Sequence, residues 1–256
     1  LNIKGVAYGT LFSALITSSI FLIYMFYYLS KHTKIKINLK QILNFSKIKN
    51  IFNINLNIFI RTILLTFSFL WFTYLGTQIG EDYVAANAIL INLVFLSAFI
   101  LDAYAFSTEG IVGYSLGKKD LSLFKNIVKN SFILSSISGL IISIIYFFAY
   151  EHVINLMSDL EEIRELSSSY VIWLIILPLI SSFCYQFDGI FIGASQTKEL
   201  RNAMVFSVLS YLIISIILTK LLFNTGIWIS LCIFMILRAI SLFYYLDKIY
   251  LRFRKS

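Results

Sequence analysis

Long, uninterrupted apolar runs constrain this chain more than any other feature of its sequence. A membrane-spanning helix needs about 20 mostly apolar residues, and seven runs reach that length. In lipid only helices and closed barrels satisfy every backbone hydrogen bond, and a barrel would show alternating segments of about ten residues. The runs do not alternate, so we predict helices over seven ranges: 5–29, 55–79, 84–116, 127–150, 167–193, 202–223 and 226–246.

The composition excludes a soluble globule. Apolar residues make up 59% of the 256 residues and charged residues 13%, whereas soluble domains have about 45–50% and about 25%. We therefore predict an all-α integral membrane protein. Cys184 and Cys232 lie inside apolar runs, and His32 and His152 lie in polar connections. We thus expect no metal site, no cofactor other than a coupling ion, and no enzyme.

Lysine and arginine are distributed unevenly over the connections. The segments 30–52, 116–129, 194–201 and 248–256 carry 16 of the 21, and the opposite side carries three, Lys4, Arg164 and Lys220. Because cytoplasmic loops retain basic residues, we predict a multi-pass protein of the plasma (inner) membrane of a bacterium, with a cytoplasmic C-terminus. The net charge of +8 then belongs to membrane loops, and no nucleic-acid partner is expected.

One connection differs from the rest. Residues 30–54 mix lysines with apolar residues such as Ile42, Phe45 and Ile48, which is typical of an amphipathic helix at the inner membrane surface or of a solvated basic loop. Because this segment follows one span and precedes six, we predict a leading helix over 1–29, an inter-lobe linker over 30–54 and a six-helix lobe over 55–256. The chain opens on Leu rather than Met, and we expect further residues ahead of it.

Five charged residues lie inside the predicted spans, where each costs at least about 2.5–3.5 kcal/mol at the centre. At about 1.5 Å per residue, four of them lie about 10–14 Å inside the cytoplasmic boundary: Arg61, Glu109, Asp188 and Arg238. Two acids and two bases at one depth predict a neutral buried ion network, which either locks the helices or couples ion movement. Pro178 kinks the fifth span nearby, as a flex point or as a static bend.

The fifth charge, Asp102, lies about 22 Å from the cytoplasmic boundary, where no basic residue has a matching depth. An unpaired carboxyl group in a low dielectric favours its protonated form, as in a proton-coupled carrier. Asp102 shares one helix face with Asn87, Glu109 and small residues, which include Gly113 of a Gly113–Gly117 GxxxG pair. We predict that this face meets other helices or a cavity and that the opposite face meets lipid, with Leu93, Leu96, Ile100 and Ile111.

Several segments carry a family likeness when taken in order. The third span contains ANAIL at 86–90, LDAYAFSTEG at 101–110 and GYSLG at 113–117; the second opens NIFIRT at 57–62; the fifth closes FDGIFIGA at 187–194, followed by ELRN at 199–202. Together they resemble the DinF-like branch of the multidrug and toxic-compound extrusion (MATE) family, over essentially the whole chain.

The resemblance implies a twelve-span antiporter of two six-helix lobes that exports amphipathic or cationic small molecules by alternating access, driven by protons or sodium. The chain would be the last span of the first lobe, the linker and the whole second lobe, with the missing N-terminal lobe of the same polypeptide as its partner. Asp188 matches an acid implicated in cation binding in sodium-coupled relatives, but the second span offers Arg61 in place of an acid, which favours protons over sodium.

These arguments yield two sets of candidate residues. The coupling candidates are Asp102, Glu109 and Asp188, with Arg61 and Arg238 as charge partners. Candidates for lining a substrate cavity are polar and aromatic residues of the third and fifth spans, for which packing or lipid contact is the alternative: Asn87, Tyr104, Phe106, Tyr185 and Gln186.

Three other classes of protein remain open. A flippase for lipid-linked sugars or other lipids would use the same scaffold. A seven-helix receptor is suggested by the span count alone, and the span 226–246 has no lysine that could bind retinal. An intramembrane enzyme would need a nucleophile with its base, a metal or paired carboxylates, and Asp102 and Glu109 are about 10 Å apart along one helix.

Overall fold

The computed structural model describes residues 2–32 and 44–254 and is all-α. Its helices are α1 (Asn2–His32), α3 (Phe45–Ile79), α4 (Glu81–Lys118), α5 (Leu121–Met157), α6 (Glu161–Ser169), α7 (Val171–Gly193) and α8 (Thr197–Arg254). The chain divides into two units, Leu1–Ile51 and Phe52–Ser256. Within the described residues, six helices are long and apolar enough to cross a membrane, which makes this a multi-pass membrane protein.

The sixth of these helices, α8, contains two of the predicted spans. Phe223 has φ 52° and ψ −133°, so the backbone reverses there and separates a first arm, 197–222, from a second arm, 224–254. With both arms counted, the second unit holds six spanning segments, and α1 is the seventh. The prediction of about seven helices, six of them in one lobe, is confirmed.

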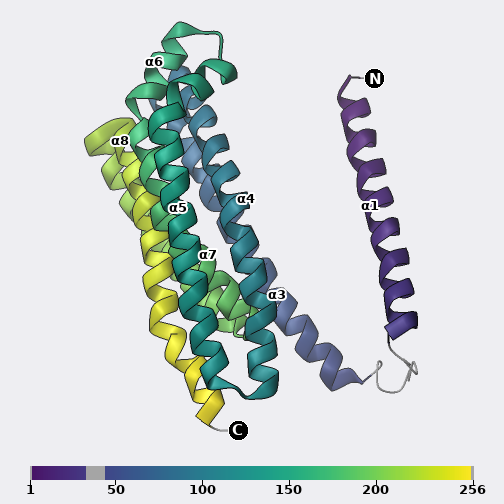
Figure 1. Cartoon of the computed structure of the whole chain (residues 1–256). Coiled ribbons are helices and arrows are strands. Elements are labelled where there is room, and N and C mark those ends of the chain that lie inside the picture. Colours follow the sequence, from purple (N-terminus) through teal and green to yellow (C-terminus); the bar gives the residue numbers. More distant parts are fainter. Residues whose placement is uncertain (1, 33–43, 255–256) are drawn as a thin grey trace. The chain divides into compact units, whose positions relative to one another are not determined.

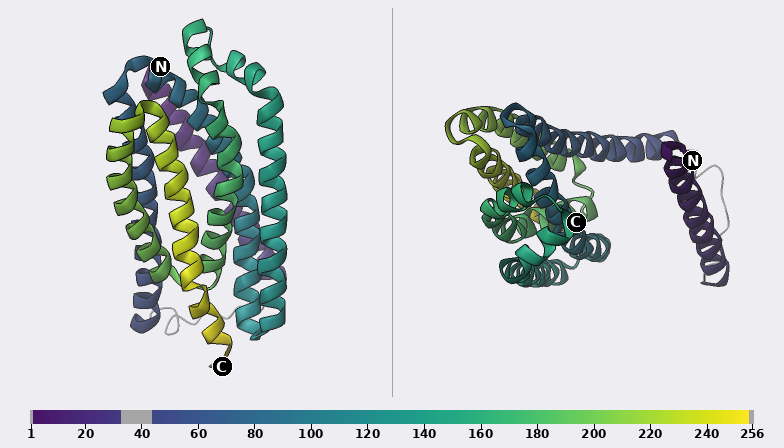
Figure 2. Two further views of the ribbon diagram at one scale, coloured as in Figure 1. Left: turned by 90° about the vertical axis from the view of Figure 1, so that its left-hand side faces the viewer. Right: turned by 90° about the horizontal axis from the view of Figure 1, so that it is seen from above.

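The helices of the second unit run alternately up and down because their connections are short (Figure 1). Between α4 and α5 the chain turns at Lys119, which has a left-handed φ of 58°, and Asp120 then caps α5 by accepting a hydrogen bond of 2.8 Å from the amide of Leu123. A side-chain acceptor at this position satisfies one of the free N–H groups of the first turn. The short helix α6 and the C-terminus lie at opposite ends of the lobe (Figure 2).

Two predicted boundaries need correction. The fifth span was expected to begin at residue 167, but the helix breaks at Tyr170, and the polar stretch before it forms the separate helix α6. Residues 45–54 of the predicted linker are the first turns of α3, with Phe45, Ile48 and Ile51 exposed. Ile42 and Leu43 lie outside the described residues, so the amphipathic-helix prediction for 30–54 stays a prediction.

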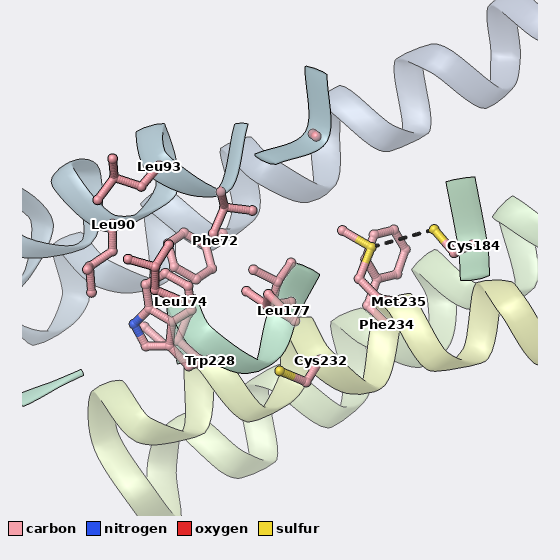
Figure 3. Close-up of a cluster of buried hydrophobic side chains, with 14 of the residues drawn as sticks. Phe72, Leu90, Leu93, Leu174, Leu177, Cys184, Trp228, Cys232, Phe234 and Met235 are labelled. Atoms are coloured by element: carbon pink, nitrogen blue, oxygen red, sulfur yellow. Dashed lines mark hydrogen bonds between the residues drawn. The ribbon is translucent and has the colours of Figure 1, made fainter. Parts of the chain in front are cut away.

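The apolar core sits between α3, α4, α7 and α8. Its centre contains Phe72 and Trp228, whose rings meet edge to face at 4.9 Å, with Leu90, Leu174 and Leu177 packed around them (Figure 3). Both cysteines are free and buried here, and the sulfur atoms of Cys184 and Met235 lie 3.9 Å apart. Leu96, Ile100 and Ile111 of α4 are exposed, as predicted for a lipid-facing side.

Small residues bring α7 into backbone contact with its neighbours. A Cβ atom on Gly189 or Gly193 would overlap the carbonyl oxygen of Ala105 or of Glu109 on α4, and one on Gly139 of α5 would come within 2.9 Å of the carbonyl oxygen of Pro178. The close approach therefore uses a GxxxG pair on α7. Of the pair noted on α4, Gly113 faces the carbonyl oxygen of Gly193 at 3.4 Å, whereas Gly117 faces open space. Leu93, predicted to face lipid, is buried because the core face of α4 runs along Leu90, Leu101 and Thr108.

Candidate functional site

Three of the five membrane-embedded charges meet at one atom. Oδ2 of Asp188 on α7 accepts a hydrogen bond from Nη2 of Arg61 on α3 and another, of 2.7 Å, from Nη2 of Arg238 on α8. Asp188 and Arg238 are buried, and the side chain of Arg61 is 15% exposed. We call Arg61, Asp188 and Arg238 the charge triad; it joins three helices that are far apart in sequence.

The charge triad has unused hydrogen-bonding capacity. Oδ1 of Asp188 and the Nε atoms of Arg61 and Arg238 are buried and have no hydrogen-bond partner within residues 2–32 and 44–254. Arg238 is further held by Met235, whose sulfur accepts from Nη1 at 3.3 Å, and by Phe234, whose ring centre lies 5.5 Å from the guanidinium carbon. The arginine heads are thus fixed by packing, while the carboxylate keeps one free acceptor.

The charge triad carries a net charge of +1, because two guanidinium groups share one carboxylate. Two like unit charges about 4 Å apart repel by about 4 kcal/mol at an effective dielectric constant of about 20. A second anion nearby would relieve this repulsion. An added cation such as sodium would increase it.

Asp102 is the candidate for this second anion. Its half-buried carboxyl group on α4 interacts electrostatically with Asp188, Arg61 and Arg238, although it forms no ion pair or hydrogen bond with the described residues. The depth argument placed Asp102 out of reach of any base. It fails because α4 continues past the end of α7, so depths counted from the two helix ends are not equivalent: Gly189 lies against Ala105, and Gly193 lies against Glu109. Ionised Asp102 and the charge triad together are neutral.

Glu109 does not join the charge triad. It was expected to complete a layer with Arg61, Asp188 and Arg238, but it lies half-buried on α4 and forms no ion pair with the described residues. The neutral four-charge set therefore has a different membership from the predicted one, with Asp102 in place of Glu109. The reason is its level along α4: the backbone of Glu109 lies against Gly193, five residues beyond Asp188 on α7.

A second polar cluster lies in the half of the lobe where the arms of α8 meet. The side-chain amides of Asn87 on α4 and Asn224 on α8 bond to each other twice, at 2.6 and 3.1 Å, and the indole N–H of Trp228 donates to Oδ1 of Asn87 at 2.9 Å. We call these three residues the amide network. Asn87 also lines a small space of about 60 Å³ with Phe72 and Gly76.

The other candidates for lining a cavity are not gathered at one place. Phe106 is 69% exposed on the surface of α4, whereas Tyr185 is buried in the core. Tyr104 accepts a hydrogen bond of 2.8 Å from Ser138 on α5. Gln186 is fully buried; its Oε1 accepts from Thr108 at 3.1 Å, and its Nε2 has no hydrogen-bond partner in the part of the chain that the structure describes. Their role as cavity residues stays a prediction.

Sequence reasoning missed the partners that fix the site. Asn224 and Trp228 were not singled out, although an asparagine at a helix reversal is a signal that could have found the former. Gly189 and Gly193 follow Asp188 directly with the same GxxxG spacing that was noted on α4. Met235 lies three residues before Arg238 on the same helix, a spacing that places the two side chains next to each other.

The sequence of the chain is similar to a known protein family and to two known proteins. A family model described as MatE matches residues 58–221. The chain is 34% identical over 189 residues to the DNA damage-inducible protein F of Escherichia coli (strain K12). The matched region covers 74% of this chain and 41% of that protein. It is 24% identical over 181 residues to Protein DETOXIFICATION 43 of Arabidopsis thaliana, covering 71% of this chain and 34% of that one. The chain thus spans less than half the length of these relatives.

Solved structures share the fold. A MATE protein in complex with MaL6 superposes with a TM-score of 0.85 at 16% identity, covering 98% of this chain and 57% of that one. A transporter of the MOP superfamily from Pyrococcus furiosus superposes with a TM-score of 0.70 at 22% identity, covering 77% of this chain and 44% of that one.

Proposed function

This chain belongs to the MatE family of membrane transporters, and on that premise we propose that it forms part of a cation-coupled antiporter that exports amphipathic or cationic small molecules. In this proposal protons, rather than sodium, drive export, and the six-helix lobe works against a second lobe in the inner membrane of a bacterium. The observation that carries the proposal is the net charge of the charge triad, which a single carboxyl group, Asp102, brings to zero.

The charges suggest why a proton and a cationic substrate would exclude each other. With Asp102 ionised, the set of Asp102, Asp188, Arg61 and Arg238 is neutral. Either a proton on Asp102 or a cation beside it raises the charge to +1, and both together raise it to +2, which a low-dielectric interior strongly disfavours. Mutually exclusive occupancy is the requirement for exchange of one cation against the other.

The same sum of charges argues against a sodium ion bound at Asp188. Its one bonded oxygen already faces two guanidinium groups, so a sodium ion there would be the third cation around one carboxylate. Sodium sites need several oxygen ligands, whereas a proton needs one carboxyl oxygen. Glu109 is the further coupling candidate, since it is half-buried on the same helix as Asp102 and has no charged partner among the described residues.

Transport in everted membrane vesicles tests this function. The protein is expressed from its complete gene, and uptake of a fluorescent lipophilic cation is followed after a pH gradient or a sodium gradient is imposed. We expect uptake with the pH gradient. In Asp102→Asn the rate of uptake should fall by about 5- to 150-fold, the factor to which typical coupling free energies correspond. Asp82→Asn, an exposed carboxyl on the same helix, is the matched control and should keep wild-type uptake.

Three results would contradict the proposal. Uptake driven by sodium alone would reverse the choice of ion, and wild-type uptake in Asp102→Asn would remove this residue from the mechanism. Movement of a fluorescent lipid-linked sugar between leaflets, without uptake of any cation, would favour the flippase.

A further inference from the structure

A groove of about 400 Å³ opens between the two arms of α8, which lie side by side (Figure 2). It lies toward the ends of the arms that are far from the reversal at Phe223. Most of its lining is apolar, and its polar groups lie at the far end. The lining includes Phe206, Leu237 and Ile240, and also Asn202, Ser241 and Tyr245. We call this hollow the arm groove. A volume of about 300–1,000 Å³ with a few polar groups is typical of a binding site.

A second hollow adjoins the arm groove at Ile240, which lines both. It encloses about 330 Å³ between α7 and the second arm of α8, and all its lining residues are apolar, with Phe183 and Ile236 among them. At about 1.5 Å per residue, the two hollows together extend about 13 Å along the second arm, from Tyr245 to Ile236. Half of a hydrocarbon core of about 30 Å has a similar depth. The hollows therefore match the depth of one leaflet.

Three basic side chains lie at the polar end of the arm groove. Nη2 of Arg201 donates to Oδ1 of the lining residue Asn202 at 2.9 Å. Nζ of Lys248 lies 5.0 Å from the ring centre of Tyr245, another lining residue. Lys198 is exposed one helical turn before Asn202, on the same face of the first arm.

The basic groups at this end outnumber the acids. Glu199 pairs with Lys248 at 3.1 Å, so that with Lys198 and Arg201 these four residues carry a net charge of +2. The next acid along the second arm, Asp247, lines a different hollow together with residues of α5. An anion complements the polar end of the arm groove, and a hydrocarbon chain complements the rest.

We propose that the arm groove binds an anionic phospholipid, with an acyl chain in the groove and the phosphate among Lys198, Arg201 and Lys248. Tyrosines are enriched where hydrocarbon meets headgroups, and Tyr244 and Tyr245 line the groove next to its basic end. An amphipathic cation would fit the apolar part, but the net positive charge at the end would repel it. The lipid site is thus distinct from any site for an exported cation and does not depend on the ion that drives export.

Lipid retention, measured by native mass spectrometry, tests this site. The complete protein is purified in detergent and titrated with phosphatidylglycerol or with phosphatidylcholine, two lipids that can carry the same acyl chains and differ in headgroup charge. The charge variant is Lys198→Gln with Lys248→Gln. Its matched control is Lys118→Gln with Lys129→Gln, which removes two exposed lysines of α4 and α5.

A second variant tests the apolar part and leaves all the basic groups in place. Ser241 is partly exposed and lines the arm groove, so Ser241→Trp fills the space that an acyl chain would occupy. Ser136→Trp, at a serine of α5 that is also partly exposed, is the control for the same change. Unfolding temperatures show that each variant is folded before its lipid retention is compared.

We expect the wild-type protein to retain phosphatidylglycerol more tightly than phosphatidylcholine. The charge variant should bind phosphatidylglycerol about 30-fold more weakly, the factor to which two basic residues near a membrane surface correspond, and its affinity for phosphatidylcholine should change little. Ser241→Trp should weaken the binding of both lipids, and both controls should behave as wild type.

Four results would overturn the inference. Equal retention of the two lipids by the wild-type protein would remove the role of the basic end. An equal loss in the Lys118→Gln and Lys129→Gln control would mean that surface charge alone attracts the lipid. Wild-type retention in Ser241→Trp would place the lipid elsewhere, and displacement of phosphatidylglycerol by a lipophilic cation would assign the arm groove to the exported substrate.

Discussion

Nη2 of Arg238 lies 2.7 Å from Oδ2 of Asp188, with the arginine side chain only 1% exposed. An arginine this deeply buried stays charged at any physiological pH. The pair is therefore a permanent ionic contact inside the lobe, and Arg61 shares the same oxygen. Substitutions of different members of the charge triad should therefore lower the free energy of unfolding by unequal amounts.

Asp188→Leu should destabilise the protein more than Arg238→Met. The first change leaves the buried Arg238 and the partly buried Arg61 without an anionic partner, and breaking a buried ion pair costs about 3–5 kcal/mol. The second leaves Asp188 paired with Arg61, so its cost should be smaller. Thermal unfolding in detergent measures both, with the exposed Lys118→Met as control. An equal or reversed ranking would mean that Asp188 does not hold the two arginines together.

Alanine at Gly189 and at Gly110 should act in opposite directions. At Gly189 the methyl group would overlap the carbonyl oxygen of Ala105, and overpacking of this kind costs about 1–3 kcal/mol. At Gly110, on the other helix of the same pair, nothing lies within 4 Å of the new atom, so alanine should stabilise by about 0.5–1 kcal/mol through helix propensity. Unfolding temperatures give the sign of each change. Two changes of the same sign would argue against close backbone packing of α7 on α4.

The helices could be predicted from the sequence because an apolar run of sufficient length has few alternatives in lipid. The contacts between the helices were harder to predict from the sequence. Depth along each helix axis correctly grouped Arg61, Asp188 and Arg238, but it excluded Asp102 and included Glu109. That error arose because α4 continues past the end of α7, so depths counted from the two helix ends are not equivalent. The pairing of Asn224 with Asn87 depends on how α8 packs against α4, which the local sequence does not encode.

Asn87→Leu should destabilise the lobe through the partners that it leaves behind. Both the amide of Asn224 and the indole N–H of Trp228 would lose their bonds while still buried. Such unsatisfied groups cost about 1–3 kcal/mol. Asn126→Leu, at an exposed position of α5, is the control for the same chemical change. If Asn87→Leu unfolds at the wild-type temperature, the amide network makes no net contribution to stability.

The thiols of Cys184 and Cys232 should be unreactive in the folded protein. Both are buried, so a membrane-permeant maleimide can reach them only after local opening. Mass spectrometry should find no adduct before denaturation and two adducts after it, and an added Ser122→Cys, at an exposed site of α5, should be labelled at once. In Asp188→Leu, Cys184 should become reactive first, because its neighbour Met235 also holds Arg238. Early labelling of Cys232 alone would contradict this arrangement.

The tight reversal at Phe223 limits where foreign sequence can be inserted. The arms of α8 meet there without a loop, so an epitope placed between them would separate the arms and expose the amide network. The connection before α6 is different, since Leu160 is 67% exposed and its neighbour Asp159 is exposed as well. An epitope inserted between Asp159 and Leu160 should leave the fold intact. Its access to antibody in whole cells would then reveal on which side of the membrane α6 lies.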